Sequence, residues 1–516
     1  MENGYLDRFH SRRSPVMSLN GMVAASQPLA ATAGLRILMD GGNAADAAVA
    51  AAAALNVTEP FSTGLGGDCF ALFYDAATKQ ISALNGSGRS PAALTMELLA
   101  KRALDRSWPH DHALTVTVPG TCAGWCDLIA RHGSMPMSAV LAPAMELAEK
   151  GFPVAPIASY FWRIGAEQQL RVSPGGRELM IDGRGPLAGE IMRLPTLART
   201  MRAIAEGGSE AFYQGPIAQR IAETVQAHGG VMEVSDLTAH QSTWETPISI
   251  NYRGVRIWEC PPNGQGLAAL SALNLLEGFA LKKQDPFSVE RWHLMIEAMR
   301  VAFADTRWYV ADPRFNPAPL EQLLSKSYAA IRRSLINSTR ATMDTKHGAP
   351  VTGSDTVYLS AVDGYGNACS FINSTYYGFG TGIVPDGTGI CLQNRGYCFS
   401  LEADHPNAPA PSKRPYHTII PAMATLESDD SLYASFGVMG GFMQPQGHVQ
   451  VVVGLVDDAL DPQAVLDRPR FCLTTATPAS RVELEEGLPV ATMSKLAQMG
   501  HQVVPVSGYA ISVFGR

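Results

Sequence analysis

The feature that most constrains the fold of this chain is an abrupt change of character at Thr356. Residues 332–355 (RRSLINSTRATMDTKHGAPVTGSD) are polar and show no periodic placement of apolar side chains, which is typical of a linker. The next residues form two strand-like runs, TVYLSAVD and ACSFINST, around the turn GYGN, and this pattern predicts a β-hairpin. Helical patterns prevail before the junction and strands after it, so we expect an α/β fold whose sheets are covered by helices.

Helical spacing of apolar residues is clear near the N-terminus. Residues 29–42 (LAATAGLRILMDGG) predict a helix that ends at a glycine pair, and residues 43–55 (NAADAAVAAAAAL) predict a second helix with side chains small enough for close packing. Gly64, Gly66 and Gly67 follow in STGLGGDCF. Because this segment lacks both GxGxxG and a Walker lysine, a tight turn before a strand is a better interpretation than a phosphate-binding loop.

Length and charge narrow the class of protein. A chain of 516 residues suggests two or three domains by length alone, and its 46% hydrophobic and 17% charged residues are typical of a globular protein. The net charge of −7 offers no basic surface for nucleic acid, so a small molecule is the expected partner. The most apolar stretch, residues 44–55, is too short to cross a bilayer, and the first residues contain no apolar signal segment. We therefore expect no membrane association and a cytoplasmic location.

The eight cysteines are scattered, and no pair has CxxC spacing. Cys122 and Cys126, with His110 and His112 upstream, offer donors for zinc, but their spacing matches no familiar site. We therefore expect reduced thiols, no metal and no cofactor.

Two common catalytic motifs are missing, since neither GxSxG nor HExxH occurs. The junction between Asp355 and Thr356 suggests a different chemistry. A threonine that follows a linker can attack the carbonyl before it, and hydrolysis of the resulting ester frees an α-amino group that acts as base for the same hydroxyl. A threonine that merely opens a strand looks the same in sequence. His417, in SKRPYHT, is either structural or a substrate contact.

Several blocks, in the same order, resemble the γ-glutamyltranspeptidase family over most of the chain. They are DGGNAADAAVAAAAALNVTEP (40–60), GLGGDCFALFYD (64–75), VTVPGTCAGW (116–125), PPNGQG (261–266) and EAMRVAFADTRWYVADP (297–313), and, in the last third, TVYLSAVDGYGNACSF, GFGTGIVPDGTGICLQN, SKRP and GVMGGFMQPQGHVQ. The resemblance implies a four-layer αββα sandwich of the N-terminal-nucleophile hydrolase type. It also implies a precursor that is cut between Asp355 and Thr356. The large subunit (1–355) and the small subunit (356–516) would then form one folding unit.

The resemblance assigns roles to individual residues. Thr356 matches the family's nucleophile, and Ser374 matches the hydroxyl that hydrogen-bonds to it, with Thr375 as the alternative if the register slips by one. Gly440 and Gly441 match the glycine pair whose N–H groups form the oxyanion hole. Two donors aimed at the developing negative charge are the expected main source of rate.

The substrate-binding positions depart from the family pattern. Ser87 stands where the family has an arginine for the substrate α-carboxylate, and Arg89 lies two residues further on. Cys398 replaces the aspartate that binds the α-amino group, and His417 and Thr418 replace a pair of serines. The contact for the amino group is therefore expected to be lost, and the contact for the carboxylate to be rebuilt.

Arg395 is the candidate for the rebuilt contact, because a guanidinium can hold a carboxylate through two parallel hydrogen bonds. A salt bridge at the surface or at a subunit interface would explain this arginine equally well. Loss of the amino-group contact removes a charged pairing worth about 2 kcal/mol, which disfavours γ-glutamyl transfer from glutathione.

These departures resemble the divergent amidohydrolase branch of the family, which includes oxamate amidohydrolase and acylases. We expect hydrolysis of an amide bond in a small substrate that bears a carboxylate. The alternatives are γ-glutamyl transfer or hydrolysis, an unprocessed binding protein, and a serine hydrolase that acts through Ser26 or Ser87.

Two further expectations concern assembly. The processed chain is expected to form a homodimer. Family members usually continue past the last strand, whereas this sequence stops at AISVFGR, so we expect either a missing tail or an unpaired strand edge there.

Overall fold

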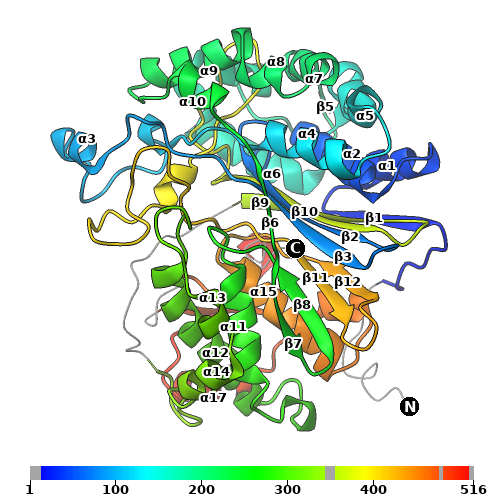
Figure 1. Cartoon of the computed structure of the whole chain (residues 1–516), viewed down its shortest axis with the longest axis vertical. Helices are drawn as coiled ribbons and strands as arrows, with labels where there is room; N and C mark the ends of the chain where they lie inside the picture. Colours follow the sequence, from blue (N-terminus) through cyan, green and yellow to red (C-terminus); the bar gives the residue numbers. More distant parts are fainter. Residues whose placement is uncertain (1–12, 343–354, 476–479, 511–516) are drawn as a thin grey trace.

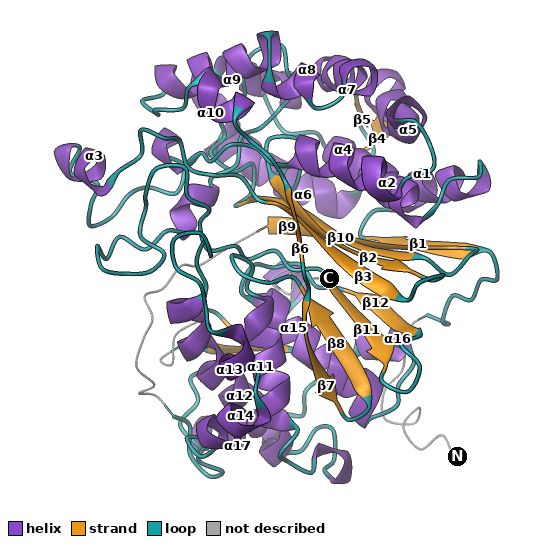
Figure 2. Cartoon of the chain, in the orientation of Figure 1, coloured by secondary structure: helices purple, strands orange, loops and turns teal. Residues whose placement is uncertain are grey.

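The computed structural model describes residues 13–342, 355–475 and 480–510. Two β-sheets lie face to face between two layers of helices (Figure 1, Figure 2). The four-layer αββα sandwich expected from the sequence is therefore confirmed. Within the described chain, no helix has the length and apolar character needed to cross a membrane.

Both sheets combine strands from the two sides of the junction at Thr356. The larger sheet contains, in order, β1 (Gly21–Ala25), β9 (Asp355–Asp363), β10 (Ala368–Tyr376), β2 (Asp68–Asp75), β3 (Gln80–Gly86) and β6 (Thr243–Glu245). The smaller sheet contains, in order, β12 (Leu432–Phe436), β11 (Ala422–Leu426), β8 (Val255–Glu259) and β7 (Ile248–Tyr252). Residues 1–355 and 356–516 thus share each sheet.

The outer layers come from separate stretches of the chain (Figure 1). The helices on the side of the larger sheet are α1 (Pro28–Met39), α2 (Ala44–Thr58), α4 (Thr121–His132), α5 (Met137–Lys150), α6 (Pro156–Gln168), α7 (Pro195–Gly207) and α9 (Pro216–Ala227), with the short α3 (Met96–Lys101), α8 (Glu210–Tyr213) and α10 (Val234–Thr238) in the same half of the chain. The helices on the side of the smaller sheet are α11 (Gly266–Leu276), α12 (Val289–Tyr309), α13 (Leu320–Leu323), α14 (Lys326–Arg333), α15 (Met443–Val452), α16 (Pro462–Asp467) and α17 (Val490–Gln498). Small peripheral sheets are formed by β4 (Phe152–Pro153) with β5 (Ile191–Met192), and by β13 (Phe471–Leu473), β14 (Val482–Glu485) and β15 (Val503–Val506).

The alanine-rich helix α2 forms the centre of one helical layer. All 15 of its residues are buried, and it contacts α1, α5, β9 and β10. A capping box starts it, because the Asn43 side chain accepts from backbone N–H groups and the Asp46 carboxylate accepts from the Asn43 N–H. The small side chains allow close packing on all sides, as the sequence predicted, and so they hold β9 and β10 against a fixed layer.

Apolar side chains from both sheets form the core between them. Phe70 and Leu72 of β2 and Ile372 of β10 belong to one buried cluster with Met423 of β11. On each strand these residues alternate with side chains that face the helices, because successive side chains of a strand point to opposite faces of the sheet. The sheets are therefore joined by direct packing near the start of β9.

The predicted linker is only partly a linker. Arg332 and Arg333 are the last residues of α14, so the helix extends into the segment assigned to the linker. The Arg332 guanidinium pairs with Asp305 at 2.7 Å, and Arg333 donates to the carbonyls of Asn274 and Leu275 at the end of α11. These tertiary contacts give no periodic signal in sequence, which explains the error. Residues 343–354 of the predicted linker lie outside the described residues.

The glycine cluster provides a turn and a close backbone approach. A Cβ atom at Gly66 would overlap the carbonyl oxygen of Cys391, and one at Gly67 would overlap that of Ser374. The Gly67 carbonyl also accepts from the N–H of Thr121 at 3.0 Å. The prediction of a tight turn before β2 is confirmed, and the turn brings β2 close to Ser374.

Candidate active site

Thr356 lies at the start of β9, and its hydroxyl faces β10. The residue is 1% exposed, and its Oγ1 donates to the Oγ of Ser374 at 3.1 Å. Val357 pairs with Asn373 and Asp355 pairs with Tyr376, so the register shifts by one residue opposite Thr356. Such a β-bulge bends the strand and re-aims its side chains. The regular register continues from Val357 and Asn373 to place Ser374 opposite Thr356, and the Thr356 hydroxyl bonds to Ser374 rather than to its neighbour Thr375.

The hydroxyl of Ser374 collects three donors. Besides Thr356, the backbone N–H of Tyr376 donates to its Oγ at 2.8 Å, and Nη2 of Arg395 lies at 3.3 Å. Three donors around one oxygen fix the position of that oxygen, and with it the direction of the Thr356 hydroxyl. Ser374 is therefore suited to orient a nucleophile.

Arg395 is completely buried behind Ser374. Its Nη1 donates to Oγ1 of Thr418 at 2.7 Å and lies 3.9 Å from Sγ of Cys398, and its guanidinium stacks over the Tyr376 ring at 4.4 Å. Within the described residues, no carboxylate forms an ion pair with Arg395. The interpretation of Arg395 as a surface or interface salt bridge is therefore wrong, and the arginine brings to the site a buried positive charge whose influence extends to the Asp68 carboxylate.

A buried carboxylate, Asp68, organises the opposite side of Arg395. Its Oδ1 accepts from the N–H groups of Gly88 and Gly120 and from Gln393, and its Oδ2 accepts from Nε2 of His417 at 3.0 Å. Burial alone would raise the pKa of Asp68, but the hydrogen bond from His417 and the charge of Arg395 lower it below its usual range.

His417 is held as a neutral imidazole. Burial, reinforced by the positive charge of Arg395, lowers the pKa of His417 to about 3. Its Nδ1 accepts from the N–H of Ile419 at 3.3 Å, so we assign the proton to Nε2, which donates to Asp68. Both ring nitrogens are thus engaged within the protein, and His417 supports Asp68. Its role as a substrate contact stays a prediction.

Ser87 and Arg89 lie with a different arginine, Arg414. The Ser87 Oγ accepts from Asn263 at 2.9 Å, and its carbonyl accepts from Nε of Arg414. Burial, together with the charge of Arg414, lowers the pKa of Arg89 to about 10, and Arg89 donates to the carbonyl of Gln241. Along the described chain, no hydrogen bond or ion pair joins either residue directly to Thr356. Their substrate-binding roles stay predictions.

The serine hydrolase alternative finds no support in this geometry. The exposed Ser26 donates to Glu59 at 2.9 Å, and Ser87 bonds to Asn263. In the part of the chain that the structure describes, neither hydroxyl is hydrogen-bonded to a histidine that could act as its base.

Gly440 and Gly441 form the turn between β12 and α15. Their φ angles are +103° and +60°, which favour glycine. Within the described residues, neither N–H group has a hydrogen-bond acceptor, whereas the Gly441 carbonyl accepts from Gln265 at 2.8 Å. Gly437, just before the turn, packs on the Tyr358 ring of β9, two residues after Thr356. Two donors that a glycine turn fixes, and that have no acceptor among the described residues, are suited to hold an oxyanion.

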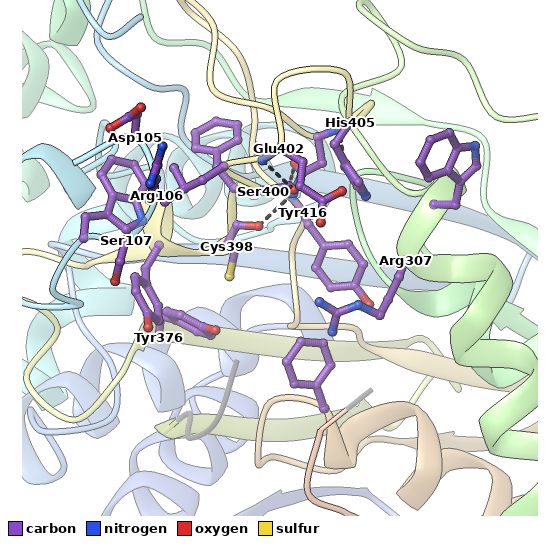
Figure 3. Close-up of a pocket in the computed structure, with 17 residues that line it drawn as sticks. Asp105, Arg106, Ser107, Arg307, Tyr376, Cys398, Ser400, Glu402, His405 and Tyr416 are labelled. Atoms are coloured by element: carbon purple, nitrogen blue, oxygen red, sulfur yellow. Dashed lines mark hydrogen bonds between the residues drawn. The ribbon is translucent and has the colours of Figure 1, made fainter. Parts of the chain in front are cut away.

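A cavity of about 490 Å³ opens beside these groups (Figure 3). Tyr376, Cys398 and Phe442 line it, and each is bonded to or next in sequence to a residue described above. Burial raises the pKa of the Cys398 thiol, although the charge of Arg395 opposes the shift, so the position assigned to an amino-group contact carries a neutral thiol. Thr356 is not among the lining residues, so the cavity adjoins its surroundings through Tyr376 and Phe442.

The sequence did not identify several members of this site. Asp68, Gln393 and Gln265 stand within resemblance blocks, yet no local pattern distinguishes them from ordinary buried polar residues. Gln265 donates to the carbonyls of both Thr418 and Gly441 and so ties the arginine side of the site to the glycine turn. Only the position of such residues in the fold reveals their contacts.

The four potential zinc donors, for which the sequence already disfavoured a site, do not form a metal-binding group within the described chain. His112 accepts from the Leu114 N–H at 3.0 Å, while His110 stacks on Tyr377. All eight cysteines are free thiols, as the sequence predicted. Among the described residues, the three side chains that could share a metal ion are His293, Glu297 and His501.

This second group is better described as a polar network. His293 bonds to His501 at 2.8 Å and to the Asn337 carbonyl at 2.6 Å, and Arg300 pairs with Glu297 at 3.3 Å. The positive charge of the arginine opposes a metal ion at this position.

Comparisons with known proteins agree with this geometry. The family model described as gamma-glutamyltranspeptidase matches residues 30–514. The "Glutathione hydrolase-like YwrD proenzyme" of Bacillus subtilis is 36% identical over 96% of this chain and 93% of that protein. The "Oxamate amidohydrolase proenzyme" of Klebsiella pneumoniae is 34% identical over 96% of this chain and 93% of that protein.

A solved structure shows the same similarity in three dimensions. The cephalosporin acylase from Bacillus halodurans superimposes with a TM-score of 0.91 at 44% identity, over 98% of this chain and 92% of that one. Sequence, fold and the arrangement around Thr356 all lead to one assignment: the chain is an enzyme that belongs to the gamma-glutamyltranspeptidase family.

Proposed function

We propose that this enzyme cuts its own chain before Thr356 and then hydrolyses an amide bond in a small substrate that carries a carboxylate. The observation that carries the proposal is the hydrogen bond from Thr356 Oγ1 to Ser374, formed on a buried strand that starts directly after the predicted linker. Relatives named as proenzymes support the self-cleavage. The cleavage site itself, the cytoplasmic location and the homodimer stay predictions.

Self-cleavage would proceed by an N-to-O acyl shift. Thr356 Oγ1 attacks the carbonyl carbon of Asp355, the C–N bond breaks, and an ester forms between Asp355 and the threonine oxygen. Water then hydrolyses this ester, which leaves a carboxylate on Asp355 and a free α-amino group on Thr356. That amine is the general base for the hydroxyl of the same residue.

Turnover would repeat this chemistry on an external amide. The α-amino group of Thr356 accepts the hydroxyl proton while Oγ1 attacks the amide carbon. The N–H groups of Gly440 and Gly441 stabilise the oxyanion. The proton passes to the leaving amine, and water hydrolyses the acyl-enzyme to the free acid. In this scheme Ser374 keeps Oγ1 aimed at the substrate.

The charges around the cavity favour a substrate with a carboxylate and no α-amino group. Arg395 has no carboxylate partner within the described chain, and the neutral Cys398 cannot pair with an ammonium group. The relatives named oxamate amidohydrolase and cephalosporin acylase support hydrolysis of substrates other than γ-glutamyl compounds. Because another relative is named glutathione hydrolase-like, γ-glutamyl hydrolysis is the second candidate function.

A matched pair of substrates tests the choice. Glutaryl-p-nitroanilide and γ-glutamyl-p-nitroanilide differ only in the α-amino group, and a missing charged contact is worth about 2 kcal/mol. We expect the purified, processed enzyme to hydrolyse the glutaryl compound with a kcat/KM at least about tenfold higher. Release of p-nitroaniline measures both rates, and oxamate serves as the smallest carboxylate substrate. A preference for the γ-glutamyl compound would instead establish the second candidate.

Replacing Arg395 distinguishes a role in positioning Ser374 from a role in binding the substrate carboxylate directly. Because its guanidinium reaches Ser374 and is fully enclosed, we expect Arg395→Met to lower kcat by about 10- to 100-fold for glutaryl and pentanoyl p-nitroanilides alike. Arg256→Met, which removes a half-buried arginine that pairs with Glu427 at 2.6 Å, should change kcat less than about threefold. An effect confined to KM for the glutaryl compound would support the sequence-based expectation that Arg395 binds the carboxylate directly.

A further inference from the structure

A second arginine, Arg307, faces the cavity from the last turn of α12. It lines the cavity together with Tyr416 and Phe442, and its guanidinium lies 5.7 Å from the centre of the Phe442 ring (Figure 3). Its Nη1 is buried, and within the described residues it has no hydrogen-bond partner. Nor does any carboxylate in the described chain form an ion pair with this guanidinium.

A half-buried guanidinium whose buried Nη1 has no partner among the described residues is costly to a protein. Burial lowers the pKa of Arg307, while the neighbouring Tyr416 and Tyr376 oppose the shift, yet a guanidinium stays protonated near neutral pH. Two carboxylates, Asp105 and Glu402, also line the cavity, but Glu402 is exposed and neither is paired with Arg307. A buried charge that the protein leaves without a partner is suited to an anion supplied by a ligand.

Two of the residues that line the cavity lie next to the catalytic candidates. Tyr376 lines it, and the backbone N–H of this residue holds Ser374 in place. Phe442 lines it as well and follows Gly441 directly in sequence. Thr356 itself does not line the cavity, so we infer that the acyl chain of a substrate attacked by Thr356 enters the cavity past Tyr376 and Phe442. The aromatic walls suit a short methylene chain.

Arg307 and Arg395 differ in what they offer a ligand. Arg395 is 0% exposed and already donates to Ser374 and Thr418. Arg307 is half-buried, faces the cavity, and has no such partner among the described residues. The charges of both arginines act on the Cys398 thiol, but Arg307 lines the cavity together with Cys398, whereas Arg395 is not among the lining residues. Of the two, Arg307 is the one that a substrate anion can reach.

We propose that Arg307 is the specificity-determining residue that binds the distal carboxylate of an ω-carboxyacyl group, so that the enzyme prefers monoamides of short dicarboxylic acids. The inference rests on the proposed function, and it adds the chemical class of the acyl group and the residue that recognises this group. The planar guanidinium can hold a carboxylate through two parallel hydrogen bonds, and it lies over the Phe442 ring at 5.7 Å from the ring centre.

The first test compares selectivity in processed enzymes. The substrates are the p-nitroanilides of succinic, glutaric and adipic acid, with pentanoyl-p-nitroanilide as the neutral reference. We expect Arg307→Met to lower the ratio of kcat/KM for the best acid to that for the pentanoyl compound by about 10- to 100-fold. Arg307→Lys, which keeps the charge but not the two parallel bonds, should recover part of this ratio.

Arg106→Met is the matched control, because Arg106 lines the same cavity but is exposed. Solvent screens its charge, so the ratio should change by less than about threefold. If the ratio fell equally in Arg307→Met and Arg106→Met, the effect would be general electrostatic attraction, and the assignment to Arg307 would be overturned. A ratio near one in the wild-type enzyme would overturn it as well.

A binding measurement tests the inference independently of turnover. Titration calorimetry with glutarate and with pentanoate, on processed wild-type and Arg307→Met proteins of matched melting temperature, should show tighter binding of glutarate that is lost in the variant. Equal binding of both acids would overturn the inference even if the enzyme hydrolyses amides. Selective binding of glutarate by an enzyme that hydrolyses no amide would instead keep the Arg307 site and refute the proposed function.

Discussion

A Thr356→Ala variant is expected to remain a single chain of 55.1 kDa without amidase activity, whereas the wild type separates into two fragments. Cleavage before Thr356 leaves fragments of about 38 kDa (355 of 516 residues) and about 17 kDa (the remaining 161 residues). The alanine has no Oγ1, so it can neither shift the acyl group nor attack a substrate. Intact-mass spectrometry of the denatured proteins measures the outcome directly.

Ser360→Ala is the matched control on the same strand. Ser360 also carries a hydroxyl on β9, but its Oγ donates to Ser435 at 2.7 Å, so this variant should mature like the wild type. Thr356→Ser should mature slowly, because it keeps the hydroxyl but loses the β-branch that restricts χ1. A single full-length mass for the wild type would favour the unprocessed binding protein, and cleavage of the alanine variant would exclude Thr356 as the cause of maturation.

The second large effect is expected at the glycine turn. Gly440→Ala places a side chain on a residue with φ of +103°, which forces the turn to change and displaces the two N–H groups from the oxyanion position. Loss of one such donor typically lowers kcat by about 10²- to 10³-fold. We expect this loss in the processed fraction of the variant, measured with the preferred p-nitroanilide after the amount of small fragment has been quantified.

Gly254→Ala controls for backbone strain. Gly254 has φ of +89° in the turn between β7 and β8, and a Cβ there meets no other atom within 4 Å. The control should lose stability by a similar amount, of order 1–3 kcal/mol, while the processed enzyme keeps its kcat. If kcat falls equally in both variants, the glycine pair has no special place in catalysis and the oxyanion donors must be sought elsewhere.

Local sequence patterns predicted much of the architecture. The alternating runs after Thr356 became the hairpin of β9 and β10, and the alanine-rich run became the fully buried α2. Such elements follow from the period of their own apolar residues, so neighbouring residues suffice to predict them. The turn at Gly66 and Gly67 was also predicted locally, because only glycine permits that close approach of backbones.

The extent of the linker was not predictable in this way. Polar composition suggested that it began at Arg332, but this residue belongs to α14 and pairs with Asp305. A charged side chain has the same appearance in sequence whether it is solvated or bonded to a distant segment. Composition therefore marked the end of a helix too early.

In the candidate site, too, some features follow from the sequence and others only from the tertiary structure. The sequence by itself determined that Thr356 opens a strand after a polar segment, and the family resemblance named Ser374 and the glycine pair. Only the tertiary structure decided that the Thr356 hydroxyl bonds to Ser374 and not to Thr375, that Arg395 is buried against Ser374, and that Arg307 faces the cavity without a partner among the described residues. The physical reason is that strand and helix periodicity is set by neighbours in the chain, whereas burial and the pairing of charges are set by residues that the fold brings together from far apart.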